Sequence, residues 1–207
     1  MVDFGAGRGR FTDDLKPYAH RLQMLRGKVA RVIGVDVDPV VKENPSLDEA
    51  IVWEPGLHID LPDASVDLIV SDYTFEHIDD PGVVVAEFER ILRPGGWVCA
   101  RTPNRRGLIA IGARVVPNSL HVRALRRLEP QRQEMDVFPT RYRLNTLGQV
   151  RRAFTAPGWA VHGYATGEPA YVGNSAVLAY LMFGLLRILP MRLQPMYLFF
   201  IRRSVES

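Results

Sequence analysis

The chain has 207 residues, of which 47% are hydrophobic and 24% are charged, which is the length and composition of a single globular domain. This composition excludes a disordered or low-complexity protein. The only cysteine, Cys99, excludes an intramolecular disulfide. The longest apolar run, Ala176–Leu186, has eleven residues, whereas a membrane-spanning helix needs roughly 18 or more.

The net charge of +3 is unevenly distributed along the chain. Residues 1–100 carry 10 Lys and Arg against 18 Asp and Glu, whereas residues 101–152 carry 12 Arg against 3 acids. A basic segment after an acidic one indicates either an anionic partner or a solvated helical face. The first residues do not show the pattern of a secretory leader, and we expect a cytoplasmic protein.

Strand and helix patterns alternate through the first hundred residues. Short apolar or β-branched runs predict strands at residues 1–4, 30–35, 51–53, 66–71 and from 97 onward. Helical patterns cover residues 12–26 and, after the helix-start pair Asp80 and Pro81, residues 83–92. Residues 93–96 are expected to end that helix and turn the chain. This alternation predicts parallel βαβ units and a doubly wound α/β fold.

After Thr102 the alternation stops. Residues 103–152 are rich in arginine and mostly helical in pattern, and we expect them to form a helical insertion after the fifth strand of one domain spanning 1–207. Further strands are predicted at 159–164 and 196–202, with an apolar helix at 175–189 between them. Two interpretations of that helix stay open: a core helix against the sheet, or an interfacial element flanked by Arg187 and Arg192.

The residues that carry chemistry begin directly after the first strand. The loop Gly5-Ala6-Gly7-Arg8-Gly9 follows that strand, and open parallel sheets bind ligands at the carboxyl ends of their strands. Asp36 ends the next strand, where a carboxylate can accept hydrogen bonds from ribose hydroxyls. The dinucleotide fingerprint requires glycine at the position of Arg10, so a nicotinamide oxidoreductase is disfavoured.

Several ordered motifs together resemble the class I S-adenosylmethionine-dependent methyltransferases, particularly the broad group of small bacterial enzymes called methyltransferase type 11. The motifs are residues 2–9, 34–36, 61–69, 71–78 and 92–96. The resemblance covers residues 1–102. It implies a Rossmann-like fold with a mostly parallel seven-stranded sheet, S-adenosylmethionine as the cofactor, no metal, and transfer of a methyl group to oxygen, nitrogen or carbon.

The resemblance also implies which residues bind the cofactor. Asp3 and the glycine loop would hold its methionine end, Asp36 would bind the ribose hydroxyls, and Val37 would pack on the adenine. The family usually has an acidic residue facing the adenine amino group at the position of Pro55, and a one-residue slip would give that role to Glu54. The full predicted set is Asp3, Gly5, Ala6, Gly7, Asp36, Val37, Glu54 and Ser71.

The sulfonium of the cofactor already activates the methyl group, so the protein would mainly hold the reactants in line. A general base is needed only for a poorly ionised hydroxyl or a protonated amine, and the candidates are His77, Asp72 and Tyr73. Arginines near the site would suit an anionic acceptor. The residues expected to form the acceptor site are Asn104, Arg105, Arg141, Tyr142 and Arg143.

A small-molecule acceptor, either anionic or lipophilic, is favoured over nucleic acid, because no RNA-binding motif accompanies the arginines. The apolar helix at 175–189 would favour a lipophilic acceptor or a membrane surface. A nucleic-acid methyltransferase and a non-catalytic nucleotide-binding or scaffold domain of the same fold remain the alternatives. The sequence does not indicate an oligomeric state. Members of the family usually have a full first strand and covering helices before the glycine loop, whereas this chain reaches the loop at once.

Overall fold

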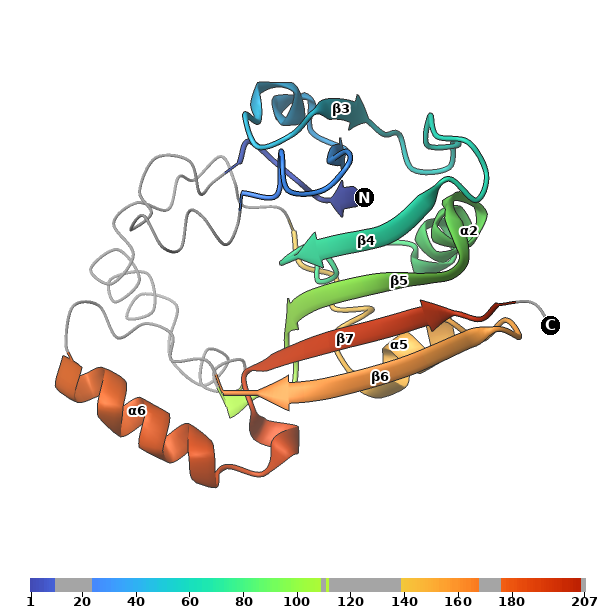
Figure 1. The fold of residues 1–207 in the computed structure, drawn as a ribbon. Helices are drawn as coiled ribbons and strands as arrows, with labels where there is room; N and C mark the ends of the chain where they lie inside the picture. The colour runs from blue at the N-terminus through green and yellow to red at the C-terminus, as the bar shows by residue number, and fades with distance from the viewer. Residues whose placement is uncertain (10–23, 109–110, 112–138, 168–175, 206–207) are drawn as a thin grey trace.

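The computed structural model describes residues 1–9, 24–108, 111, 139–167 and 176–205. They build a seven-stranded sheet with the strand order β3-β2-β1-β4-β5-β7-β6 (Figure 1). β7 runs antiparallel to β5 and β6, and all other neighbours are parallel, which confirms the predicted α/β fold. The strands are β1 (Val2–Phe4), β2 (Ile33–Asp36), β3 (Glu49–Val52), β4 (Val66–Asp72), β5 (Leu92–Pro103), β6 (Trp159–Thr166) and β7 (Met196–Arg203).

Two helices, α2 (Pro81–Ile91) and α5 (Leu147–Ala153), cover one face of the sheet and close its main core. Phe88 of α2 is fully buried and meets Phe4 of β1 edge to face, with ring centroids 4.9 Å apart. Val150 of α5 belongs to the same core. This packing fixes the end of β1, from which the glycine loop starts.

α2 begins at the predicted position. The Asp80 side chain accepts a hydrogen bond from Gly82 N at 2.8 Å, and Pro81 occupies the first helical turn, where its missing N–H costs nothing. The predicted turn at residues 93–96 lies inside β5, because Leu92 already pairs with Val66. The next pair is Trp97 with Leu68, so the extra residues bulge out of the ladder.

Other boundaries differ from the sequence prediction. β2 begins at Ile33 and not at Ala30. The predicted helix at 12–26 lies mostly outside the described residues, and residues 24–26, which are described, are not helical. Most of the predicted insertion at 103–152 also lies outside the described residues, and its last six residues belong to α5, a helix of the core layer.

A third helix, α6 (Ala176–Ile188), connects β6 to the short 3-10 helix η3 (Met191–Leu193) and β7. Figure 1 shows it standing apart from the sheet. Leu186 is buried, but Val177, Tyr180 and Ile188 are each more than 70% exposed. The interpretation of this segment as a core helix is therefore wrong. None of the described helices is long and apolar enough to cross a membrane.

The sheet face opposite α2 and α5 carries a shallow hollow over β5, β7 and β6. It is lined by Trp97, His162, Tyr164 and Phe200, of which Tyr164 is 56% exposed. The hollow runs from Trp97 on β5 to Tyr164 on β6, which lies two residues before the end of that strand.

Candidate active site

The glycine loop at the end of β1 depends on residues without a side chain. Gly5 adopts φ +78° and donates its N–H to Val35 O at 2.7 Å, which turns the chain back over β2. A Cβ at Gly5 would lie 2.0 Å from Thr74 Oγ1, so only glycine fits there. Gly7, with φ +50°, has no atom of the described residues within 4 Å of its Cβ position, so these residues leave the loop surface there open to a ligand.

Asp36 holds the loop from the end of β2. Its Oδ2 accepts a hydrogen bond from Gly7 N at 2.8 Å, and its Oδ1 accepts one from Asp38 N at 2.9 Å. A carboxylate has about four lone-pair sites, so each oxygen keeps capacity for another donor. The geometry thus orients Asp36 beside the loop and leaves it able to grip hydroxyl groups of a ligand.

Asn44 supports the same loop, and the sequence did not indicate it. It follows the 3-10 helix η1 (Pro39–Glu43), and its Nδ2 donates to Ala6 O at 3.0 Å and to Gly7 O at 3.2 Å. Its side chain also fills the space beside Gly9, where a Cβ would lie 2.4 Å from Asn44 Oδ1. Asn44 is a positioning residue for the loop.

Three carboxylates gather at the carboxyl ends of adjacent strands: Asp3 on β1, Asp36 on β2 and Asp72 on β4. Burial raises the pKa of Asp3 to about 6, and the negative charges of Asp72 and Asp36 add to the effect. Like charges at one place destabilise one another unless a cation joins them. A positive charge on a bound ligand would therefore stabilise the ionised form of Asp3.

Asp72, a candidate general base, is engaged in an ion pair. Arg101 on β5 stands beside it in register and donates to both carboxylate oxygens, from Nε at 2.6 Å and from Nη2 at 2.7 Å. The guanidinium also lies over the ring of Tyr73, with Cζ 4.8 Å from the centroid. Arg101 was not predicted as a site residue, and the pair makes Asp72 an anchor more than a proton acceptor.

Tyr73, another candidate base, is 42% exposed and adopts φ +53°, a conformation that a bulky side chain rarely takes. Such strain persists only where the surroundings enforce it, and it is common at ligand sites. Ser71, by contrast, faces the main core and is 1% exposed. Its Oγ has no hydrogen-bond partner among the described residues, so only its backbone can border the site.

His77, the third candidate, is turned toward the protein. Its Nδ1 lies 3.2 Å from Pro139 O, and its Nε2 lies 4.0 Å from Oε1 of Glu76. Glu76 is buried, and burial raises its pKa. Its other oxygen accepts a hydrogen bond from Thr102 Oγ1 at 2.8 Å. These contacts favour a structural role for the pair, which ties the loop after β4 to β5.

The predicted acceptor residues are not equally exposed. Asn104 is 1% exposed, and its Nδ2 donates to Gln194 O at 2.8 Å, so its side chain is engaged inside the protein. Arg141 and Arg143 both lie near Asp79, at 3.5 Å and 3.4 Å from Oδ1. Arg105 is exposed.

Tyr142 completes this group of predicted acceptor residues. It is half-buried, and its backbone N–H donates to Glu76 O at 3.0 Å. Its φ of +54° is again unusual for a bulky residue.

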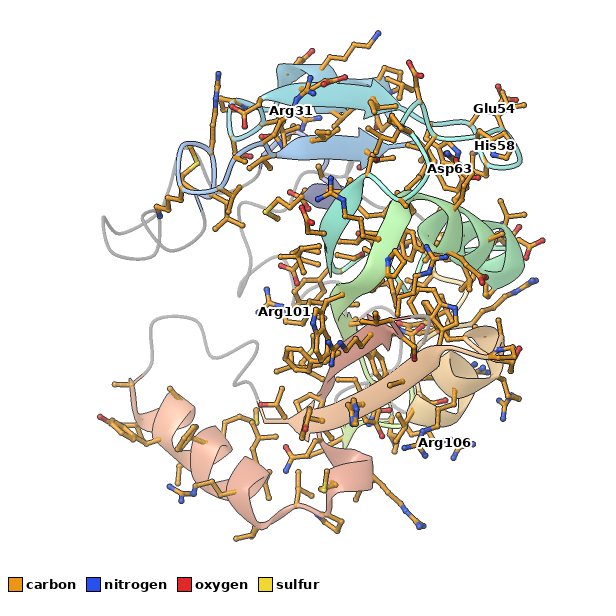
Figure 2. All side chains as sticks on the ribbon, turned by 45° about the vertical axis from the view of Figure 1, so that its right-hand side comes forward. Arg31, Glu54, His58, Asp63, Arg101 and Arg106 are labelled. Atoms are coloured by element: carbon orange, nitrogen blue, oxygen red, sulfur yellow. The ribbon has the colours of Figure 1, made fainter. Side chains whose placement is uncertain are left out.

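Two predicted adenine contacts remain predictions. Val37 follows Asp36 directly and is 48% exposed, so its apolar side chain is accessible to a planar ring such as adenine. Glu54 is exposed, and Figure 2 shows it with His58 and Asp63 at the end of the molecule away from Arg101. Trp53 N donates to Asp36 O at 2.7 Å, which places the chain before Glu54 beside the site.

Residues 2–100 match the family described as "Methyltransferase domain". Residues 2–100 therefore belong to the class I S-adenosylmethionine-dependent methyltransferase family. The family and its cofactor, S-adenosylmethionine, are those that the sequence motifs predict.

Relatives with curated descriptions share part of the chain's length. It is 36% identical over 110 residues to a probable S-adenosylmethionine-dependent methyltransferase of Mycolicibacterium smegmatis, covering 51% of this chain and 38% of that protein. It is 29% identical over 116 residues to a malonyl-[acyl-carrier protein] O-methyltransferase of Yersinia pestis, covering 54% and 39%. The chain thus spans about two fifths of the length of these curated relatives.

A solved structure shares the fold of the methyltransferase. The crystal structure of an S-adenosylmethionine-dependent methyltransferase from Archaeoglobus fulgidus superimposes with a TM-score of 0.55, at 13% identity, over 98% of this chain and 85% of that one. At this identity the likeness speaks for the fold alone.

Proposed function

We propose that this methyltransferase binds S-adenosylmethionine at the carboxyl ends of β1, β2 and β4 and transfers its methyl group to a small-molecule acceptor. The observation that carries the proposal is the set of three carboxylates, Asp3, Asp36 and Asp72, around an open glycine loop. S-adenosylmethionine supplies a methyl group activated on a sulfonium, and it carries a second positive charge on its amino group.

The described residues fit this cofactor. Asp36 has free acceptor capacity for two ribose hydroxyls beyond its bonds to Gly7 and Asp38. Burial and the neighbouring carboxylates raise the pKa of Asp3, and the positive charge of the cofactor's methionine end would stabilise its ionised form. Val37 offers an exposed apolar surface to the adenine.

The protein's own part in the reaction is orientation. Arg101 fixes Asp72, and the strained backbone of Tyr73 is held beside it by its N–H bond to Arg101 O at 2.9 Å. His77 is turned toward Pro139 and Glu76. These contacts leave in-line positioning of the acceptor as the main source of rate enhancement, with no obligatory general base among the three candidates.

The charges near the site favour a small molecule over nucleic acid. Binding to a phosphate backbone needs several uncommitted cations. Of the predicted acceptor arginines, Arg141 and Arg143 face Asp79, and Arg105 is exposed. Arg101, which was not predicted, is paired with Asp72. The relative from Yersinia pestis is named for a malonyl thioester acceptor, a small group presented on a carrier.

The acceptor class can be tested with S-adenosylmethionine labelled in its methyl group. The protein is incubated with pools of organic-soluble metabolites, water-soluble metabolites, transfer RNA, DNA and acyl-carrier protein, and the label in each product fraction is counted. We expect label in a small-molecule or carrier-bound fraction. Label in nucleic acid would contradict the proposal, and cofactor binding without turnover in any pool would favour the non-catalytic alternative.

Replacing Asp3 by asparagine is expected to stabilise the free protein and to weaken cofactor binding. Because the folded pKa of Asp3 is raised to about 6 from 3.8, its stability contribution is present below pH 3.8 and is lost as the pH rises through 6. Asp3→Asn should therefore raise the free energy of unfolding by about 2–3 kcal/mol at pH 8, and by much less near pH 4. Urea unfolding at pH 8 and pH 4, and calorimetric titration with S-adenosylmethionine, measure both effects.

Asp67→Asn is the matched control, because that carboxylate is exposed on β4 and lies outside the site. This substitution should change neither the free energy of unfolding nor the affinity for S-adenosylmethionine appreciably. Equal stability of wild type and Asp3→Asn at pH 8, or unaltered affinity, would refute the assigned role of Asp3.

A further inference from the structure

We propose that α6 is a membrane-binding element, which lays its exposed apolar face into an anionic lipid surface. The helix has 13 residues and a length of about 20 Å, so it can lie in the interface but cannot span the hydrocarbon layer. Interfacial binding of this kind requires an apolar face, positive charges at its border and a firm connection to the rest of the protein.

The apolar face is the side of α6 that points away from the protein. Val177, Tyr180, Leu181 and Ile188 are 71%, 79%, 67% and 80% exposed. Their spacing of three, four and eleven residues places them on one side of the helix, opposite the buried Leu186. Phe183 is a further exposed aromatic, at 47%. Large apolar side chains exposed together mark an interaction surface.

The charges around this face have one sign. Arg187 and Arg192 are exposed at the end of α6 and in η3, and Cζ of Arg187 lies 5.9 Å from the centroid of the Phe183 ring. The sequence has no Asp or Glu between Glu168 and Glu206. An apolar face with arginines at its end is complementary to anionic headgroups over acyl chains. A second copy of the helix would bring like charges near these arginines, so the charge favours the lipid surface.

The base of α6 is fixed to the sheet by buried hydrogen bonds. Gln194 Nε2 donates to Leu186 O at 2.5 Å and to Leu189 O at 3.1 Å. Asn104 Nδ2, at the end of β5, donates to Gln194 O at 2.8 Å and to Arg192 O at 3.1 Å. These bonds explain why Asn104 is buried, and they hold the exposed helix at a defined position.

That position is on the active-site side of the sheet. β6 is parallel in direction to β5 and ends at Thr166, whereas β7 starts at Met196 and runs back. The connection that contains α6 therefore leaves from the edge where β1, β2 and β4 also end (Figure 1). If the proposed function holds, a bilayer at this edge would present a lipophilic acceptor to the cofactor site.

Vesicle sedimentation tests the proposal on the full chain. Wild-type protein is mixed with vesicles of phosphatidylcholine alone and of phosphatidylcholine with phosphatidylglycerol, and the bound fraction is measured at low and high salt. We expect binding to the anionic vesicles that weakens in high salt. Leu181→Gln/Ile188→Gln should lower the partition coefficient at least about tenfold. Both side chains are exposed, so the fold is expected to stay intact.

Leu57→Gln/Val205→Gln is the matched control, because these residues are 61% and 64% exposed outside α6. Arg187→Gln/Arg192→Gln should reduce binding to anionic vesicles, whereas the exposed pair Arg151→Gln/Arg152→Gln on α5 should not. The proposal is overturned if wild type stays in the supernatant, or if the α6 variants bind as wild type does. It is equally overturned if light scattering shows that wild type is a dimer and that the α6 variants are monomers, because α6 would then be a dimer interface.

Failure of the proposed function gives a different result. Calorimetry with S-adenosylmethionine on Leu181→Gln/Ile188→Gln should match wild type, since α6 does not contribute to the three-carboxylate site. Vesicle binding without any cofactor binding would reject the proposed function and leave the role of α6 standing.

Discussion

Replacing Asp36 by asparagine is expected to raise the dissociation constant for S-adenosylmethionine about 100-fold. The change removes the charge and one acceptor oxygen, while the remaining oxygen can keep one of the bonds to Gly7 N and Asp38 N. Hydrogen bonds to a charged group contribute about 1.5–3 kcal/mol each, and roughly 3 kcal/mol corresponds to the expected loss. Calorimetric titration of both proteins with S-adenosylmethionine measures the change.

Asp38→Asn is the matched control two residues away. The Asp38 side chain caps η1 by accepting from Val40 N at 2.9 Å, and asparagine caps equally well. Its contact with Asp36 uses the backbone N–H, which the substitution leaves in place. Affinity within about threefold of wild type is expected. If both variants lose affinity to the same degree, Asp36 acts by loop folding and not by contact with the cofactor.

Replacing Arg90 by leucine is expected to lower the free energy of unfolding by about 3–5 kcal/mol at neutral pH. Arg90 on α2 donates to the buried carboxylate of Glu87 at 2.7 Å and to the carbonyls of Ile59 and Leu61, both at 2.7 Å. It also pairs with Asp63 at 2.8 Å. The substitution would leave Glu87 buried with His58 and Ile59 N as its remaining partners. Urea unfolding followed by tryptophan fluorescence measures the loss.

The pH dependence adds a check on the cause. Burial acts to raise the pKa of Glu87, but hydrogen bonds from Arg90, His58 and Ile59 N outweigh it and hold the pKa at about 2. The contribution of the Arg90–Glu87 pair to the free energy of unfolding is thus complete above pH 4.5 and is lost as the pH falls through 2. The difference between wild type and Arg90→Leu should accordingly shrink as the pH falls from 5 toward 2.

Arg93→Leu is the matched control for this ion pair. Arg93 pairs with Asp67 two residues beyond α2, but the two side chains are 52% and 73% exposed. Exposed pairs contribute about 0–1 kcal/mol, so the loss should be small. Equal losses in Arg90→Leu and Arg93→Leu would show that burial of the Glu87 pair has no special importance.

The parts of the site that the sequence predicted are those determined by neighbouring residues. Asp36 ends β2, and Asp80 caps α2, because strand ends and helix caps follow from a few adjacent residues. Arg101 and Asn44 were missed for the opposite reason. Arg101 meets Asp72 only through the register of β4 and β5, and Asn44 reaches Ala6 from 38 residues away.

The apolar helix α6 shows a different limit of sequence reasoning. Its composition suits a core helix, and periodicity alone cannot tell a buried helix from an exposed apolar one. Only the described structure shows that Val177, Tyr180 and Ile188 face away from the sheet. Asn104 is the reverse case, because an asparagine expected to form part of the acceptor site is buried through its bonds to η3 and Gln194.

Isothermal titration calorimetry on the wild-type chain tests most directly the claim that Asp3, Asp36 and Asp72 form a cofactor site. Separate titrations use S-adenosylmethionine, S-adenosylhomocysteine and NAD. We predict one binding site per chain for S-adenosylmethionine and for S-adenosylhomocysteine, and no heat of binding with NAD. The affinity for the cationic S-adenosylmethionine should be higher at pH 8 than at pH 5. No binding of either sulfur ligand, or saturable binding of NAD in their place, would contradict it.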